Sequence, residues 1–359
     1  MEAQHNNYCI ILAGGVGRKL WPASSKEMPK QFIDFFGTGR TLLQQTYDRF
    51  ARFITPEHIF ISTYEGYVTL VREQLPELPA GNILPEPVQL NTAQAAIWGT
   101  WHAVLDNADA NVIVSPADQL IQNEERFRTQ MLKGLDYVDK HEEVLAMGVR
   151  PTQPNSAYGY IQMGAKVNGG KMYRVQSFNE KPPVNYARMF IESGEFLWNT
   201  GIFLWKGETM GNVLAALNHR PSQSVSAVAR QMVTIAEEME YVRASFNDSI
   251  PRQIDLCVLE HCPNVAVMEC DFGWADIGCW PELHAASHRD ADDNAVSGKA
   301  HVMFSGSQHC MVYLPDNMKA VVAGLDNILV AQQGHMLFIC PNNSPDYVRK
   351  MINEAQVNL

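Results

Sequence analysis

The sequence lacks the short patterns that define common cysteine and histidine sites. Its seven cysteines include no CxxC pair, and its eleven histidines form no HExxH or HxH pattern. Neither a zinc site nor a disulfide framework is therefore indicated. The odd cysteine count favours reduced, buried thiols, and nothing in the sequence supports catalysis by a thiolate, which needs a paired base.

The chain also lacks a long apolar run and a surplus of positive charge. No stretch approaches the roughly 18 apolar residues of a membrane span, and the start, MEAQHNN followed by YCIILAGG, lacks the regions of a signal peptide. Lys and Arg number 28 against 39 Asp and Glu, a formal net charge of −11. The average surface repels a phosphate backbone, so nucleic acid and anionic membranes are not expected partners. We expect a soluble, cytoplasmic protein.

What is present is an ordinary globular composition, with 46% hydrophobic and 19% charged residues in 359. Short apolar runs alternate with helical patterns from the start, which predicts an α/β fold. We expect a Rossmann-like, mixed but mostly parallel sheet flanked by helices. Strands are expected at 8–12, 58–62, 82–84, 111–115 and 144–149, and helices at 41–53, 64–75, 91–106 and 124–140.

The pattern changes in the second half of the chain. Strand-like pieces at 158–163, 173–178 and 201–205 suggest an inserted sheet facing the substrate, and two helices are expected at about 207–218 and 222–244. From about residue 294 short strands dominate, separated by turns every 8 to 12 positions, until a helix at 344–354. We therefore place a boundary near residue 287, with residues 1–287 as one domain and 288–359 as a β-rich domain, either a small solenoid or a sandwich.

The most informative stretch is LAGGVGRKLWPASSKEMPKQF, residues 12–32, directly after the first expected strand. Glycines at 14, 15 and 17 let backbone N–H groups converge on an anion, and Arg18, Lys19 and Lys30 add positive charge. The stretch is neither a P-loop, which needs GxxxxGK[ST], nor GxGxxG, because Leu20 occupies the third glycine position. It predicts a triphosphate cradle, although a glycine turn with basic residues is by itself more often a tight connection.

GGVGRKLWP followed by PKQF resembles the signature of the mannose-1-phosphate guanylyltransferases, or GDP-mannose pyrophosphorylases, among the sugar-phosphate nucleotidyltransferases. Further matches follow in order along the chain: EPVQLNTA (86–93), PAD (116–118), YGYI (158–161), NEKP (179–182), WNTGIF (198–203), QIDLCVLE (253–260) and FGWADIGCW (272–280). The resemblance covers about residues 8–287 and is weaker beyond. The chain ends where larger relatives continue into a cupin-type phosphomannose isomerase domain, so that second activity is not expected.

The resemblance implies an enzyme that converts GTP and mannose 1-phosphate into GDP-mannose and diphosphate. The sugar phosphate attacks the α-phosphorus in line, assisted by Mg²⁺ and without a covalent nucleophile. Residues 1–287 would form the nucleotidyltransferase domain and residues 288–359 a left-handed β-helix-like domain, in a homodimer.

The resemblance also implies roles for particular residues. The catalytic residues would be Arg18, Lys19 and Lys30. The nucleotide would be bound by Leu12, Ala13, Gly14, Gly15, Gly17, Glu86, Asn91 and Thr92. The sugar phosphate would be bound by Gly159, Glu180, Lys181 and Asn199. The metal would be held by Asp118 and Asp276.

Without the resemblance, more ordinary structural roles remain open for several of these residues. An Asp after a strand is usually a helix cap or turn residue, and Asn91 with Thr92 makes a good helix N-cap. Glu180 and Lys181 would be an exposed charged turn, and Gly159 a strand glycine.

Three positions depart from the family pattern. Lys19 and Leu90 stand where the family has arginine, and Gln119 where it has histidine. Lysine keeps the charge but loses the bidentate fork of arginine. Two alternatives therefore stay open: a nucleotidyltransferase for another sugar 1-phosphate, or a catalytically weak regulatory protein that binds sugar nucleotides.

Overall fold

The computed structural model describes residues 6–167, 170–210, 240, 242–243, 251–262, 264–342 and 345–358. Contacts divide the chain into two compact units. The first unit contains Met1–Gly14, Tyr47–Pro116 and Ile121–Trp274, and the second contains Gly15–Thr46, Ala117–Leu120 and Ala275–Leu359. The second unit is therefore built from three separate segments of the sequence. The predicted division has a single boundary near residue 287. A division of the chain at that residue stays a prediction.

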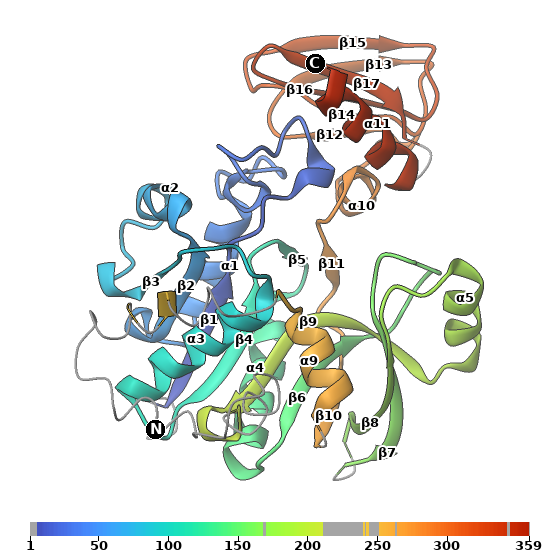
Figure 1. Ribbon diagram of the computed structural model, residues 1–359. Helices are drawn as coiled ribbons and strands as arrows, with labels where there is room; N and C mark the ends of the chain where they lie inside the picture. The colour runs from blue at the N-terminus through green and yellow to red at the C-terminus, as the bar shows by residue number, and fades with distance from the viewer. Residues whose placement is uncertain are drawn as a thin grey trace. The chain divides into compact units, whose positions relative to one another are not determined.

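A nine-stranded mixed sheet forms the centre of the first unit (Figure 1), which confirms the predicted mixed sheet. The sheet is not mostly parallel, because five of the pairings between its described strands are antiparallel and four are parallel. Its order is β3-β2-β1-β4-β9-β6-β10-β8-β7. The strands are β1 (Asn7–Leu12), β2 (Ile59–Tyr64), β3 (Ile83–Glu86), β4 (Asn111–Pro116), β6 (Val144–Val149), β7 (Tyr160–Lys166), β8 (Met172–Asn179), β9 (Phe196–Lys206) and β10 (Val265–Cys270). The four neighbouring strands β3, β2, β1 and β4 are parallel to one another, whereas β9 is antiparallel to β4, β6 and β7.

The expected strands at 158–163, 173–178 and 201–205 are all present, but the prediction of a separate inserted sheet is wrong. Strands β7, β8 and β9 join the main sheet, because β9 pairs with β4 and β6 and β8 pairs with β10. The helices expected at 207–218 and 222–244 fall mostly outside the described residues.

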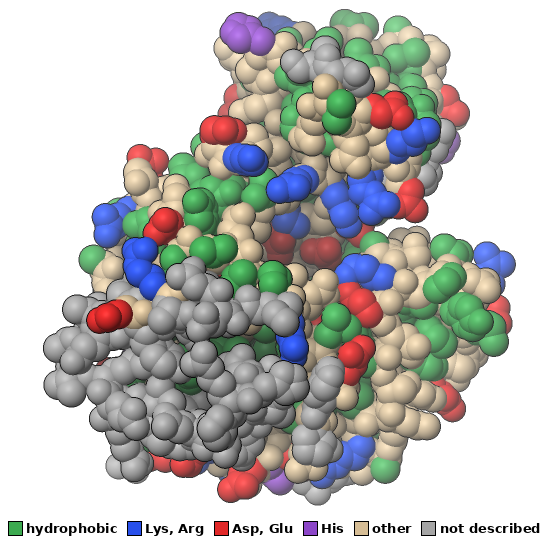
Figure 2. Space-filling view, viewed as in Figure 1, with side chains coloured by type: hydrophobic (Ala, Val, Ile, Leu, Met, Phe, Trp, Pro, Cys, Tyr) green, Lys and Arg blue, Asp and Glu red, His purple; other side chains and the backbone are tan. Residues whose placement is uncertain are grey.

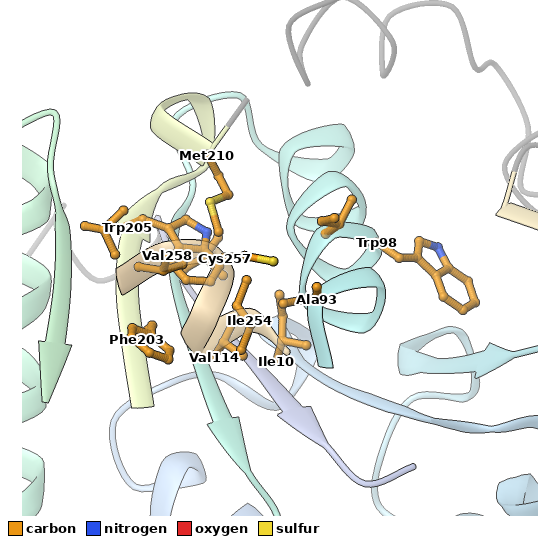
Figure 3. Close-up of a cluster of buried hydrophobic side chains, with 14 of the residues drawn as sticks. Ile10, Ala93, Trp98, Val114, Phe203, Trp205, Met210, Ile254, Cys257 and Val258 are labelled. Carbon is orange, nitrogen blue, oxygen red and sulfur yellow. The ribbon is translucent and has the colours of Figure 1, made fainter. Parts of the chain in front are cut away.

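Helices cover both faces of this sheet. They are α1 (Leu42–Ala51), α2 (Val68–Gln74), α3 (Thr92–Asp106), α4 (Glu124–Lys140), α5 (Val184–Ser193) and α9 (Ile254–His261). Side chains alternate along a strand, so Phe203 and Trp205 of β9 join the core beneath α3 and α9 (Figure 3). Leu204 points to the opposite face, where it lies close to Gly134 of α4.

The second unit contains the glycine-rich loop from Gly15 onward and the C-terminal strands. Its elements are β12 (Ala295–Ser297), β13 (His301–Ser305), β14 (Met311–Tyr313), β15 (Lys319–Ala323), β16 (Ile328–Gln333), β17 (Met336–Pro341), α10 (Trp280–Ala286) and α11 (Pro345–Asn358). Strands β12, β14 and β16 stack in parallel, and the intervening β13 and β15 pair in parallel in a second sheet. Strand β17 then pairs antiparallel with β16 at the end of the first sheet. The alternation of parallel strands between two sheets favours the solenoid prediction over the sandwich.

One hydrophobic cluster joins the loop to these strands. Leu20 and Phe35 of the loop pack with Leu329 of β16 and Phe338 of β17. The Trp21 ring meets the Phe338 ring edge-on at 5.5 Å, and the Trp280 indole donates to the Trp21 carbonyl at 3.0 Å. The tail therefore forms part of the support of the loop. Across the described helices of both units, none is long and apolar enough to cross a membrane.

Candidate active site

Acidic and basic side chains are mixed over the visible face of the molecule (Figure 2). The net charge of −11 is therefore not a uniform acidic surface. Arg18 and Lys19 are both exposed at the start of the short 3₁₀ helix Arg18–Leu20, whereas Lys30 is buried.

The glycine-rich loop is held by its own side chains. Gly17 adopts a left-handed conformation with φ of 68°, and a Cβ there would lie 2.7 Å from Cγ of Lys30. The Ser24 hydroxyl donates to the Val16 carbonyl at 2.7 Å, and the Gln31 amide donates to the Gly15 carbonyl at 2.9 Å. Only glycine fits at position 17, because both its backbone angle and the Lys30 stem exclude a side chain.

Lys30 makes a buried ion pair with Asp118. Its Nζ lies 2.6 Å from Oδ2 of Asp118 and donates to the carbonyl of Ile277 at 2.8 Å, and its side chain is 11% exposed. Burial by itself lowers the pKa of Lys30, but the charges of Asp118 and Asp276 outweigh burial and raise it. Lys30 therefore carries a fixed positive charge beside both predicted metal ligands.

Asp276 lies in the same cluster, where two carboxylates, Asp118 and Glu282, and two ammonium groups, Lys30 and Lys19, act on it. Burial, together with Asp118 and Glu282, raises its pKa well above that of an ordinary aspartate, although Lys30 acts in the opposite direction. Hard carboxylate oxygens are the donors that Mg²⁺ prefers, so the residues fit such an ion. In the described ranges no three Asp, Glu, His or Cys side chains form a metal-binding group, so a cation here would also need water or phosphate oxygens as ligands.

Three of the predicted nucleotide-binding residues, Ala13, Gly14 and Glu86, lie close to one another in the first unit. Ser62 of β2 donates to Oε1 of Glu86 at 2.9 Å, and a Cβ on Gly14 would lie 3.2 Å from the same oxygen. The Ala13 amide donates to the Ser62 carbonyl at 2.7 Å, and the Gln89 side chain donates to the Gly14 carbonyl at 2.7 Å. The absence of a side chain on Gly14 leaves room at the Glu86 carboxyl.

Glu86 is 4% exposed, and burial raises its pKa from 4.5 to about 7 despite the Ser62 hydrogen bond. A raised pKa means that the folded chain holds this proton more tightly than the unfolded chain. The protonated Glu86 side chain therefore adds to the free energy of unfolding below pH 4.5, and this contribution is lost as the pH rises through 7.

Replacing Glu86 with glutamine is therefore expected to remove a pH dependence of the free energy of unfolding. In the parent chain this group lowers that free energy by up to about 3 kcal/mol between pH 4.5 and 7. Urea unfolding of both proteins at pH 5 and pH 7.5 measures the effect. A difference between the two proteins that does not change with pH contradicts the prediction.

Asn91 and Thr92 have structural partners at the start of α3. Asn91 adopts a φ of 72° and its side chain accepts from the Thr92 amide at 2.9 Å, while the Thr92 hydroxyl accepts from the Ile254 amide at 2.9 Å. Leu90 is buried in the core beneath α3. The leucine at this family arginine position therefore contributes to packing, and the helix-cap alternative holds for Asn91.

The predicted sugar-phosphate residues converge around Asp255, which sequence analysis did not select. Nδ2 of Asn199 donates to Oδ1 of Asp255 at 2.6 Å, and the Asn199 amide donates to the Gly159 carbonyl at 2.9 Å. Lys181 pairs with Glu180, and a Cβ on Gly159 would lie 2.9 Å from Oε2 of Glu180. Burial raises the pKa of Asp255, and the hydrogen bond from Asn199 opposes this.

Two functional candidates were therefore missed, Asp255 and Glu282. Asp255 lies inside the QIDLCVLE motif, so the motif itself was an available signal. Glu282 lies just after FGWADIGCW and no pattern marked it. Its position beside Asp276 depends on the turn at residues 277–279.

The fold and these clusters define an α/β protein with a buried lysine among carboxylates beside a glycine-rich loop. A family model described as Nucleotidyl transferase matches residues 8–293. The chain belongs to this family of nucleotidyl transferases.

Named relatives agree with this class. Mannose-1-phosphate guanylyltransferase RfbM of Salmonella typhimurium is 30% identical over 97% of this chain and 72% of its own length. Alginate biosynthesis protein AlgA of Pseudomonas fluorescens is 31% identical over 96% of this chain and 71% of its own. A crystal structure of a Thermus thermophilus protein, named mannose-1-phosphate geranyltransferase, matches with a TM-score of 0.83 and 29% identity, covering 98% of this chain and 99% of that one.

Proposed function

We propose that this chain is a mannose-1-phosphate guanylyltransferase that forms GDP-mannose and diphosphate from GTP and mannose 1-phosphate. The observation that carries the proposal is the buried Lys30–Asp118 pair, held beside Asp276 at the end of a glycine-rich loop. Fixed charges in a desolvated site stabilise the charge that develops during phosphoryl transfer. The relatives named for this activity support the same substrates.

The residues divide between the two substrates. Backbone groups of residues 12–15 and 17, with Arg18, Lys19 and Lys30, bind and neutralise the triphosphate. Glu86 reads the base, since a carboxyl group can pair with the N–H donors of guanine. Glu180, Lys181, Asn199 and Gly159 hold the sugar phosphate, with Asp255 fixing the Asn199 amide.

Asp118 and Asp276 would hold Mg²⁺, which polarises phosphoryl oxygens when bound. The donor chemistry of the two carboxylates fits this ion. Lys30 restrains the Asp118 carboxylate through the 2.6 Å contact, so that carboxylate is preorganised for its role.

A panel of nucleoside triphosphates against sugar 1-phosphates, with diphosphate release as the readout, tests the proposal. The highest kcat/KM is expected for GTP with mannose 1-phosphate. A higher value for another hexose or heptose 1-phosphate would identify a related nucleotidyltransferase. GDP-mannose binding by calorimetry with no turnover on any pair would identify a regulatory protein.

Lys181→Ala is expected to raise the KM for the sugar phosphate about tenfold to a hundredfold, because a charge-assisted phosphate contact contributes about 1.5–3 kcal/mol. The KM for GTP should change little. Steady-state kinetics with each substrate varied measures both values, and Lys140→Ala, which removes an exposed lysine on α4, is the control. An unchanged sugar-phosphate KM refutes the role of Lys181.

The homodimer implied by the resemblance is part of the proposal. Light scattering of the purified chain tests it, and a monomer at micromolar concentration would contradict it.

A further inference from the structure

Glu282 in the first turn of α10 is anchored beside the predicted metal ligands. Its Oε2 accepts from the Gly278 amide at 3.1 Å, and Cys279 is the N-cap of α10. This back-bond resembles that of a capping box and fixes the turn at residues 277–279. The same turn supplies the Ile277 carbonyl to Lys30, and the Ile277 amide donates to the Asp118 carbonyl at 3.2 Å.

The hydrogen bond to the Gly278 amide uses only one of the two carboxylate oxygens of Glu282. Oε1 is buried and makes no hydrogen bond of normal geometry among the described residues, and the Cys279 thiol that interacts with the Glu282 carboxyl group is only a weak donor. A buried carboxylate oxygen without a donor costs free energy, so native proteins usually supply a donor or an ion. This oxygen indicates that a cationic or donating group belongs nearby.

Gly278 leaves a small space at this point. A Cβ on Gly278 would lie 2.7 Å from Oε2 of Glu282 and 2.8 Å from Oδ2 of Asp276. The two carboxylates therefore border the same space, which any larger residue would fill. Asp118, Asp276 and Glu282 all act on the charge of Lys30. Lys19 is a second positive charge that acts on Asp276, so three carboxylates face two ammonium groups.

We propose that Glu282 is a positioning residue of the divalent-cation site, whose charge raises the affinity for the cation held by Asp118 and Asp276. Gly278 keeps the space between Glu282 and Asp276 open. This inference rests on the proposed function, because it concerns the same cation site. It adds a residue that acts on the cation through charge and through Asp276.

The test is calorimetric titration of Mn²⁺ into the full chain without nucleotide. Glu282→Gln keeps an acceptor for the Gly278 amide and removes the charge, so the Kd for Mn²⁺ is expected to rise about tenfold. Glu125→Gln removes the same charge from a side chain that is 73% exposed on α4 and should leave Kd unchanged. Equal Kd values for Glu282→Gln and the parent chain overturn the proposal.

A second variant keeps all three carboxylates. Gly278→Ala places a methyl group between Glu282 and Asp276 and is expected to weaken Mn²⁺ binding as well. An unchanged Kd would contradict the claim that the space between these two carboxylates must stay open for the cation. Thermal unfolding in EDTA confirms that each variant is folded. The two proposals can fail separately. If Glu282→Gln weakens Mn²⁺ binding but no substrate pair turns over, the proposed function fails and the role of Glu282 stands. If the chain turns over substrate but both variants bind Mn²⁺ as the parent chain does, the role of Glu282 fails and the proposed function stands.

Discussion

Asp118→Asn and Asp276→Asn are each expected to lower kcat/KM by about 10²–10³-fold, because each removes a carboxylate that would hold Mg²⁺, and this ion would stabilise the negative charge that develops on the phosphoryl group. Both variants should also weaken Mn²⁺ binding, since asparagine is a poorer ligand for a hard cation than a carboxylate. Diphosphate release at varied Mg²⁺ measures the first effect and calorimetry the second. Full metal-dependent turnover in either variant would remove that residue from the site.

Asp118→Asn and Asp276→Asn should differ in their free energy of unfolding, because only Asp118 is the direct ion-pair partner of Lys30. Asp118→Asn leaves the buried Lys30 ammonium without its 2.6 Å partner, so we expect a loss of about 3 kcal/mol in the free energy of unfolding. Asp276→Asn removes a buried negative charge, and it is mainly this burial, together with repulsion from Asp118 and Glu282, that raises the pKa of Asp276. In EDTA that variant should be at least as stable as the parent chain.

Asp292→Asn is the matched control for both variants. Asp292 is exposed in the turn before β12, so the same charge change is made outside the cluster. Its turnover, Mn²⁺ affinity and unfolding curve should all match those of the parent chain.

Ending the chain at residue 287 is expected to lower turnover at least about a hundredfold, because the tail supports the phosphate loop. Leu20 and Phe35 pack with residues of β16 and β17, and truncation would expose them. Displacing a binding loop by about 1 Å is enough to cost two orders of magnitude in rate. A truncated chain with parental kcat/KM would show that residues 1–287 function alone.

A pair of substitutions in the full chain tests the same support without truncation. Leu329 of β16 is 0% exposed and packs against the loop cluster, whereas Leu337 of β17 is 54% exposed. Leu329→Ala should cost about 2–5 kcal/mol in the free energy of unfolding. Leu337→Ala should cost no more than about 0.5 kcal/mol. Similar losses in both variants would contradict the assigned packing.

Much of the fold was accessible from the sequence, since short-range periodicity sets strands and helices. The runs at 111–115 and 124–140 became β4 and α4 with almost the same bounds. Strand membership was harder to predict, because pairing is decided between distant segments. The strands predicted as an inserted sheet therefore joined the main sheet through β9.

The candidate site, like the fold, was predictable from the sequence only in its local parts. Residue type and local spacing alone determined the glycine-rich loop after β1 and the motifs that carry Asp118, Lys181 and Asp276. The tertiary structure decided which of these residues meet. Lys30 meets Asp118, and it meets Ile277 across 247 residues of sequence. Asn199 meets Asp255, and Glu282 meets Asp276. The tertiary structure also joined the C-terminal strands to the loop, because burial of apolar side chains depends on neighbours in space and not on neighbours in sequence.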